Sequence, residues 1–525
     1  MAIVKEKFEQ VLLEQFDDAK SHWDEDRGEA SLAGMQKCAS SLFSFNGGAS
    51  CIQRYVSSLP FCIDASVIMR DDEGVMESTK PDIAKTEIER VLTEVSDLFE
   101  LEKSSTQLIF PSCSGRVLGH VVQRALNQRI QKTIDGCLER LEDSCGSGAW
   151  SDLMQYAYGR LHRMLNNLAS SETDLEDLDL GKLLDDVLGD YRIRFITHSF
   201  DTLSSLLATF LPPPAPPDNH PSHPSFSIRT AHPDRPSPNL LLTSLERMAQ
   251  IDKASEIATK CVEGLLVCTR SIPPGPLDGS PEVLKTFSLL ISSLSTFLTK
   301  HMSDARNACG RGQEGVEERS ASELKVAVHA VMVTQRFAEE IVTPVTSHDV
   351  QLAQECTTLI WDFSVTVERQ SGELLRALVL AVGRYLSSLL SSTQHKTDFV
   401  PKSDDCALEP SQACVAGCDY VSSVSKAWSN EGPPSLGGGG GVDGNTRNLL
   451  NEVAKAACGV VTEHIRQYQY SPVGGLQLMR DLQAWKHVAV QLGSSETERH
   501  FEEYKEASNV LVIPPTDLQG FLEDG

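Results

Sequence analysis

Hydrophobic residues recur at steps of three and four along most of this chain, the spacing that places them on one face of an α-helix. The pattern is clearest over 449–468, 478–492 and 501–511. Strand-like alternation of apolar and polar residues is nearly absent. Because helices joined by short turns must cover one another's apolar faces, these three segments predict a helical bundle.

Turn-forming residues predict where these three helices begin and end. The sequence Pro-Val-Gly-Gly at 472–475 predicts a tight turn, since proline and paired glycines are poor helix formers. Ser495 and Glu498 fit the Ser-x-x-Glu capping box and predict the start of the third helix. The two prolines at 514–515 predict the end of that helix.

Composition and periodicity divide the whole chain into three helical regions and two connecting segments. We expect N-terminal helical bundles over 1–211, middle bundles over 239–430 with a long helix near 347–390, and an incomplete C-terminal bundle over 447–525. The segment 212–238 contains ten prolines and three histidines, which predicts a disordered loop. The segment 431–446 carries five consecutive glycines, which predicts a flexible linker.

Local signals refine the middle region. Ser280 is predicted to cap a helix that begins at Pro281, and the polar, glycine-containing stretch 308–320 further on predicts a loop. Gly372 or Gly383 is the expected place for an interruption of the long helix. The helical hairpins are irregular, with units of roughly 40 residues and no fixed period. The predicted fold class is therefore all-α, an elongated rod of stacked helical hairpins or an irregular α-solenoid.

The charge of the chain restricts its partners. The 525 residues include 73 acidic and 47 basic side chains, which gives a formal net charge of −26. Nucleic-acid phosphates reward clustered Lys and Arg, so we expect no nucleic-acid partner. The acidity also argues against direct docking on anionic lipid, although a local basic patch would not show in a whole-chain sum.

Cysteine usage and the apolar segments indicate a soluble protein of a reducing compartment. The 14 cysteines include no Cys-x-x-Cys pair, and the first seven residues carry charges where a signal peptide needs an apolar run. The most apolar stretch, 374–390, is interrupted by Arg376 and Arg384. It is too short and too charged to cross a bilayer.

Two short motifs resemble pieces of enzyme sites. Gly310, Gly312 and Gly315 fit the dinucleotide-binding spacing, but that fingerprint requires a strand before the first glycine, and a helix is predicted there. Ser423 and Lys426 fit a Ser-x-x-Lys pattern whose companion motifs are missing. We interpret the first as a plain loop and the second as residues on a helix surface.

Candidate metal ligands are equally sparse. His220 and His223 lie in the proline-rich segment without companion ligands, and Cys414 and Cys418 share one helical face without a nearby third ligand. The acidic run over 172–179 is typical of a solvated helix start. We therefore predict no catalytic, cofactor-binding or metal-binding residues, while an enzyme with dispersed catalytic groups stays open as an alternative.

Three stretches carry a family resemblance. They are Phe-Asn-Gly-Gly-Ala-Ser-Cys at 45–51, Gln-His-Lys-Thr-Asp-Phe-Val-Pro at 394–401, and a block from 463 to 518. The block contains Glu-His-Ile-Arg-Gln-Tyr-Gln-Tyr-Ser, then Gly-Gly at 474–475, then Asn-Val-Leu-Val-Ile-Pro-Pro-Thr-Asp-Leu. Together they resemble the Sec-ten subunit family of the exocyst, also called exocyst component five.

The resemblance implies a function without catalysis. Members of the family are helical rods of the type found in multisubunit tethering complexes, and they tether secretory vesicles to the plasma membrane before fusion. The implied partners are other exocyst subunits, most closely the Sec-fifteen subunit, with a Rab-type GTPase reached indirectly and membrane contact mainly indirect. No cofactor is implied. The implied location is the cytoplasm, peripherally at secretory vesicles and at sites of exocytosis on the plasma membrane.

The chain departs from the family pattern at both ends. It begins near the point where the family's N-terminal coiled coil ends, and it stops shortly after the block at 463–518. We expect that the coiled coil and the extreme C-terminus are lacking, either by truncation or in a genuine short form. The alternative function is that of a helical scaffold subunit in another vesicle-tethering or trafficking complex, because such rods share architecture more than sequence.

Overall fold

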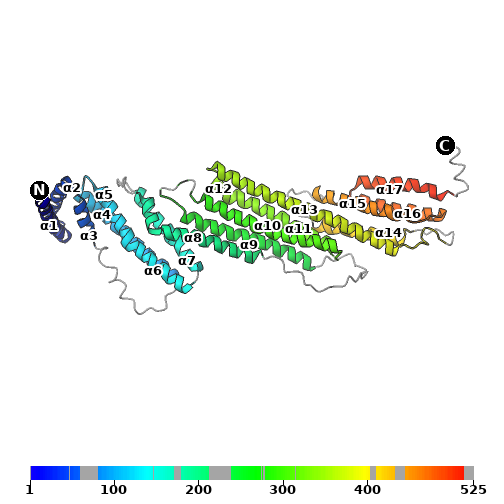
Figure 1. Ribbon diagram of the computed structural model, residues 1–525, viewed down its shortest axis with the longest axis horizontal. Helices are drawn as coiled ribbons and strands as arrows, with labels where there is room; N and C mark the ends of the chain where they lie inside the picture. The colour runs from blue at the N-terminus through cyan, green and yellow to red at the C-terminus, as the bar shows by residue number, and fades with distance from the viewer. Residues whose placement is uncertain are drawn as a thin grey trace. The chain divides into compact units, whose positions relative to one another are not determined.

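The computed structural model describes residues 2–46, 48–59, 81–145, 147–170, 179–211, 238–272, 275, 278–313, 315–401, 409–431 and 444–513. Every secondary-structure element within these ranges is a helix, which confirms the all-α prediction (Figure 1). The predicted loop and glycine linker fall largely at 212–237 and 432–443, outside the described residues.

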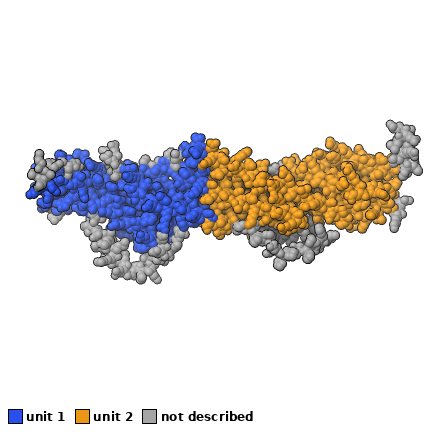
Figure 2. All heavy atoms as spheres, in the orientation of Figure 1, with its two compact units in different colours: residues 1–204, 258–286, 342–353 blue, residues 205–257, 287–341, 354–525 orange. Residues whose placement is uncertain are grey.

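The chain divides into two compact units (Figure 2). Unit 1 comprises Met1–Ser204, Ala258–Thr286 and Val342–Ala353. Unit 2 comprises Ser205–Ile257, Phe287–Ile341 and Gln354–Gly525. Segments that are far apart in the sequence therefore share each unit, so the packing of a given helix is not set by its sequence neighbours alone.

Unit 1 begins with a series of helices and one π-helical segment. They are α1 (Ala2–Asp26), α2 (Glu29–Asn46), α3 (Ala49–Ser57), α4 (Pro81–Ile109), α5 (Ser114–Ala125), the π-helix η3 (Leu126–Ile130), α6 (Gln131–Cys145), α7 (Ser147–Ser170) and most of α8 (Leu180–Phe210). The later segments add the end of α9 (Pro238–Cys268), the start of α10 (Ser280–Arg311) and α12 (Thr343–Thr346).

An aromatic cluster forms the core at the start of unit 1. The Phe110 ring lies 6.1 Å from Phe16 and 5.2 Å from Tyr55, centroid to centroid, and all three side chains are buried. The Tyr55 hydroxyl donates to the Glu102 carboxylate at 2.6 Å, and burial raises the pKa of Glu102. The hydrogen bond satisfies two polar groups that would be costly to bury without a partner.

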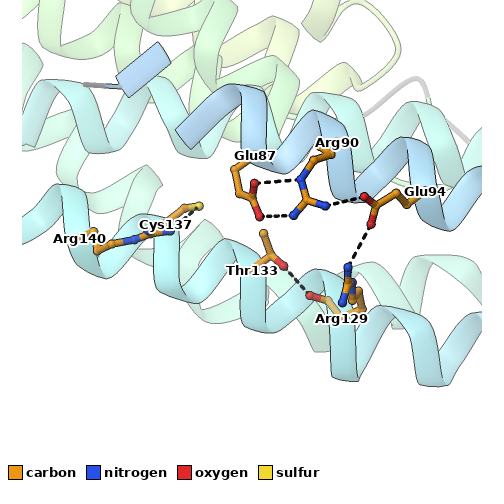
Figure 3. A network of polar contacts seen from close by, with 7 residues as sticks. All are labelled: Glu87, Arg90, Glu94, Arg129, Thr133, Cys137 and Arg140. Carbon is orange, nitrogen blue, oxygen red and sulfur yellow. Dashed lines mark hydrogen bonds and ion pairs between the residues drawn. The ribbon is translucent and has the colours of Figure 1, made fainter. Parts of the chain in front are cut away.

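A network of ion pairs between arginine and glutamate side chains links α4 to η3 (Figure 3). Arg90 binds Glu87 at 2.6 Å and also binds Glu94, whose other carboxylate oxygen accepts from Arg129 at 3.0 Å. These side chains are mostly solvent-exposed, so each pair contributes little to stability. In this network Arg90 and Arg129 both face a carboxylate, so their charges are already neutralised.

In unit 2, too, every secondary-structure element of the described residues is a helix. Its elements are the first part of α9, most of α10, α11 (Val316–Phe337), part of the π-helix η4 (Ala338–Val342), most of α13 (Val350–Thr393), α14 (Gln412–Glu431), α15 (Gly444–Ile465), α16 (Pro472–Gln491), α17 (Ser495–Ser508) and the 3₁₀-helix η5 (Asn509–Val512).

The predicted loop over 308–320 is wrong in its extent. Helix α10 continues to Arg311 because Ala308 and Cys309 are buried, and α11 already begins at Val316. The connection needs only a few residues, since Gly312 and Gly315 adopt positive φ angles of 65° and 72°. Polar composition obscured two helix ends that tertiary packing stabilises.

Three further helix boundaries differ from the sequence prediction. Ser280 is the first residue of α10, and its hydroxyl donates to the Val345 carbonyl at 3.0 Å instead of capping the helix. Helix α13 runs through Gly372 and Gly383 without interruption. The N-cap of α17 is Ser494 and not Ser495, and the Ser494 hydroxyl donates to the Asn451 amide oxygen and also hydrogen-bonds to the Thr497 hydroxyl. Contacts with distant segments thus hold both Ser280 and Ser494.

Among the described helices, α13 alone is long and apolar enough to cross a membrane by length and composition, with 39% of its most apolar window buried. Its apolar side chains Leu374, Leu378 and Leu386 are fully buried inside the protein. The Arg384 guanidinium donates to the Cys309 carbonyl at 2.9 Å. These contacts are those of a core helix in a bundle.

We predict that Trp485→Ala lowers the free energy of unfolding by about 3–5 kcal/mol, the usual cost of emptying a buried aromatic site. Trp485 is 3% exposed, and its ring stacks on Phe501 at 6.3 Å. The matched control is Trp361→Ala, because Trp361 is 68% exposed and its removal should cost less than about 0.5 kcal/mol. Guanidinium unfolding followed by circular dichroism would measure both, and equal midpoints for the two variants would contradict the packing.

Candidate functional site

A network of hydrogen bonds in unit 2 lies where the loop after α13 meets the start of α16. The Asp398 carboxylate closes this loop by accepting from the His395 backbone N–H at 2.9 Å and from Gln394 at 2.7 Å. The closed loop directs Phe399 inward, where its ring lies 5.4 Å from Tyr468 and 4.9 Å from Tyr470. An aspartate turn thus positions a buried aromatic anchor.

The Phe399 carbonyl connects this loop to α16. The Ser471 backbone N–H donates to it at 3.0 Å, and the Ser471 hydroxyl in turn accepts from the Gly474 N–H at 3.1 Å. Ser471 is therefore the N-cap of α16 and Pro472 is its first residue, a position that suits proline. The tight turn predicted at 472–475 is wrong, because these residues form the first turn of the helix.

Two glycines permit the close approach. A Cβ atom on Gly474 would lie 1.7 Å from the Phe399 carbonyl oxygen, and one on Gly475 would lie 3.1 Å from the Leu511 Cβ. We call the contacts among Phe399, Ser471 and Gly474 the Phe399 junction. The junction and Leu511 bring together parts of the two C-terminal stretches on which the family resemblance depends.

A buried carboxylate lies next to the junction. Asp481 is 5% exposed and accepts hydrogen bonds from the Ser411 N–H and hydroxyl, both at 2.7 Å, and from Gln477 at 3.2 Å. Burial raises the pKa of Asp481, while the three hydrogen bonds oppose that rise. These bonds fasten the start of α14 to α16.

The interior next to the junction has no room for a substrate. The space among Phe399, Asp481 and Trp485 measures about 10 Å³, which is close to the volume of a single water probe. His464 in its wall is buried, and burial lowers its pKa, which favours the neutral imidazole. The arrangement can hold three chain segments together but cannot enclose a reacting molecule.

The short motifs singled out in the sequence lie apart from any enclosed site. Gly310, Gly312 and Gly315 lie at and between the ends of two helices, and no strand precedes them within the described residues. The Ser423 hydroxyl donates to the Tyr420 carbonyl of its own helix at 2.6 Å, and both Ser423 and Lys426 are exposed. Neither motif has the structural setting that its chemistry requires.

The candidate metal ligands are divided between described and undescribed residues. The sulfur atoms of Cys414 and Cys418 lie 3.9 Å apart on α14, and their mutual hydrogen bond together with burial raises the pKa of Cys414. A raised thiol pKa disfavours the thiolate that binds metals. His220, His223 and most of the acidic run at 172–179 lie outside the described residues, and the described part contains no group of three or more potential ligands.

An exposed apolar face on α13 was missed by the sequence analysis. Trp361 is 68% exposed and Val365, one helical turn further on, is 42% exposed. Their spacing places them on one side of the helix, away from the buried Phe363 and Val367. A helical-wheel comparison of 356–374 would have shown Trp361 outside the buried stripe. Large exposed aromatic residues are typical of protein interaction surfaces.

The chain is similar in sequence to a known family of proteins. The family described as "Exocyst complex component Sec10-like, alpha-helical bundle" matches residues 3–211 and 278–525. The chain is 22% identical over 564 residues to exocyst complex component SEC10a of Arabidopsis thaliana, which covers 98% of this chain and 64% of that protein. It is 22% identical over 536 residues to exocyst complex component 5 of Homo sapiens, which covers 97% of this chain and 67% of that protein.

A third relative, exocyst complex component 5 of Oryza sativa subsp. japonica, is 22% identical over 564 residues, with 98% of this chain and 66% of that protein covered. The chain therefore spans about two thirds of the length of the relatives that it matches. The matched residues include the Phe399 junction and most of both units.

We predict that Gly474→Ala destabilises unit 2 by about 2–4 kcal/mol, because the added methyl group collides with the Phe399 carbonyl. The matched control is Gly459→Ala in α15, where nothing lies within 4 Å of the added Cβ. The control should stabilise by about 0.5–1 kcal/mol, since alanine is the better helix former. Thermal melting would compare the two variants, and a harmless Gly474→Ala would show that the loop does not dock here.

We further predict that Asp481→Asn reduces the pH dependence of stability. Burial raises the pKa of folded Asp481 above the ordinary value of 3.8, so the folded state holds the proton more tightly than the unfolded chain. The free energy of unfolding should therefore fall as pH rises from about 4 through the raised pKa. Denaturation at several pH values should show a shallower fall for Asp481→Asn than for the parent chain. The same change at the exposed Asp362 is the control, and equal slopes for both variants would refute the prediction.

Proposed function

The chain belongs to the Sec10 family of exocyst complex components, and from this we propose that it is a non-enzymatic exocyst subunit. In this role it is a scaffold that helps to tether secretory vesicles to the plasma membrane before fusion. The observation that carries the proposal is the family match over 3–211 and 278–525, which includes residues of both compact units.

The described structure supports a scaffold over an enzyme on physical grounds. The buried ionisable groups serve packing: Asp481 joins two helices, and Glu102 pairs with Tyr55. Exposed apolar side chains such as Trp361 in unit 2 and Leu101 in unit 1 offer contact area for other proteins. A protein that binds several partners at once raises their effective concentration near one another, which is the physical basis of tethering.

The proposed partners are the other exocyst subunits, with the Sec-fifteen subunit as the nearest. A Rab-type GTPase on the vesicle would be reached through that subunit, and contact with the membrane would be mainly indirect. The proposed location is the cytoplasm, peripherally at secretory vesicles and at sites of exocytosis. The names of the family and its relatives support membership of an exocyst complex.

Affinity purification from the cell of origin tests the proposal. The tagged chain should recover several different exocyst components in comparable amounts, because a stable subunit interface survives washing that removes chance contacts. The tag alone is the control, and mass spectrometry identifies the recovered proteins. Recovery of a different tethering complex would replace the proposal with a scaffold role in that complex. Recovery of the chain alone would reject both assignments.

A further inference from the structure

A groove of about 450 Å³ runs over unit 1 between α4, α7 and the residues that follow α9. Three cations line it, namely Lys85 from α4, Arg163 from α7 and Arg270 just after α9. Asp152 is the one carboxylate in the lining, and Tyr156 and His162 contribute rings. The helices are labelled in Figure 1. The groove has the size of a typical small-molecule site, which is roughly 300–1,000 Å³.

The walls of the groove are held by buried hydrogen bonds. The Tyr158 hydroxyl donates to the Arg270 carbonyl at 2.9 Å, and the His162 Nε2 lies 2.9 Å from the Ser271 carbonyl. Because a carbonyl can only accept, the His162 Nε2 carries the proton, and its Nδ1 accepts from Asn166 at 3.1 Å. The backbone around Arg270 is therefore fixed to α7.

A glycine opens the centre of the groove. Gly159 lies on α7 between Tyr156 and Arg163, and a Cβ at this position would come within 3.2 Å of Val267. Any larger side chain would fill the space between α7 and the end of α9. The three cations therefore line one open groove from α4, from α7 and from the loop that follows α9.

The cations of this groove lack the neutralisation seen elsewhere in unit 1. In the network of ion pairs between α4 and η3 shown in Figure 3, Arg90 and Arg129 each face a carboxylate. Among the residues that the structure describes, Lys85, Arg163 and Arg270 form no ion pair. The Lys85 ammonium lies 5.9 Å from the centre of the Tyr156 ring, and Arg163 only makes a long contact, 3.4 Å, to a backbone carbonyl.

The acidic side chain that contacts the groove residue Tyr156 is already engaged. Glu89 accepts from the Tyr156 hydroxyl at 2.9 Å and is bound by the Arg160 guanidinium. Two unpaired guanidinium groups and one ammonium thus face a single exposed carboxylate, Asp152. In a chain with a net charge of −26, this is a local concentration of free positive charge.

We propose that this groove binds a compact polyphosphorylated anion, either a free inositol phosphate or the same group as a lipid headgroup. Guanidinium groups match phosphate oxygens with paired hydrogen bonds, and an ammonium adds a point charge. A small ring that carries several phosphates presents several negative charges to the three cations that line this one groove. The inference is independent of exocyst membership, because it rests on unit 1 alone.

The test uses the complete chain with two probes, inositol trisphosphate in solution and phosphatidylcholine vesicles that carry phosphatidylinositol bisphosphate. The charge-reversal variant Arg163→Glu/Arg270→Glu should bind the soluble probe at least about ten-fold more weakly, since two charge-assisted contacts are lost. The matched control is Arg116→Glu/Lys132→Glu, which changes the net charge equally at exposed positions of α5 and α6. It should stay within about two-fold of the parent chain. Calorimetry and vesicle sedimentation give the affinities, and circular dichroism confirms that both variants fold.

The outcomes separate the sources of the phosphate. Binding of both probes, lost in the groove variant alone, supports a lipid headgroup site, and binding of the soluble probe alone supports a free inositol phosphate. Equal losses in both variants would overturn the proposal, because they would show only non-specific attraction. Displacement of the inositol phosphate by an equally charged glutamate peptide at the same concentration would also overturn it.

Discussion

Backbone-to-backbone contact between the Phe399 loop and α16 is the constraint on which the C-terminal part of unit 2 depends. The Phe399 carbonyl occupies the space that any side chain at 474 would fill. It also accepts the Ser471 N–H, which is one of the groups left without a partner at a helix start. Phe399 then packs between Tyr468 and Tyr470, and Asp481 fastens α14 beside it. A single carbonyl therefore orders a loop, a helix start and an aromatic core.

Helix identity could be predicted from the sequence because it follows from local periodicity, whereas several boundaries could not. At 472–475 the residues that usually end a helix begin one, since Ser471 caps the helix and the glycines admit Phe399. At 308–320 polar composition concealed two helix ends that bury Cys309 and Val316. Both errors have one cause, which is that a distant segment decides the local conformation.

The sequence identified the residues of the Phe399 junction but not those of the cationic groove. The residues of the Phe399 junction were singled out as identifying stretches, but nothing local showed that 394–401 touches 471–475. The cationic groove was not predicted, because Lys85, Arg163 and Arg270 come from separate segments and each looks like an ordinary surface residue. The net charge of the whole chain also concealed this local group of cations. The Debye length in physiological salt is about 8 Å, so a ligand in the groove senses the nearby cations far more than remote acidic residues.

The exposure of Trp361 has a spectroscopic consequence. Trp23, Trp150, Trp428 and Trp485 are at most 9% exposed, whereas Trp361 is 68% exposed. The five tryptophans of the chain thus separate into four shielded indoles and one that water and soluble quenchers can reach. Iodide quenching of the unlabelled protein would report mainly on the outer face of α13. Any subunit that covers this face would shift the emission to shorter wavelength and protect it from quenching, so the chain carries its own probe of assembly.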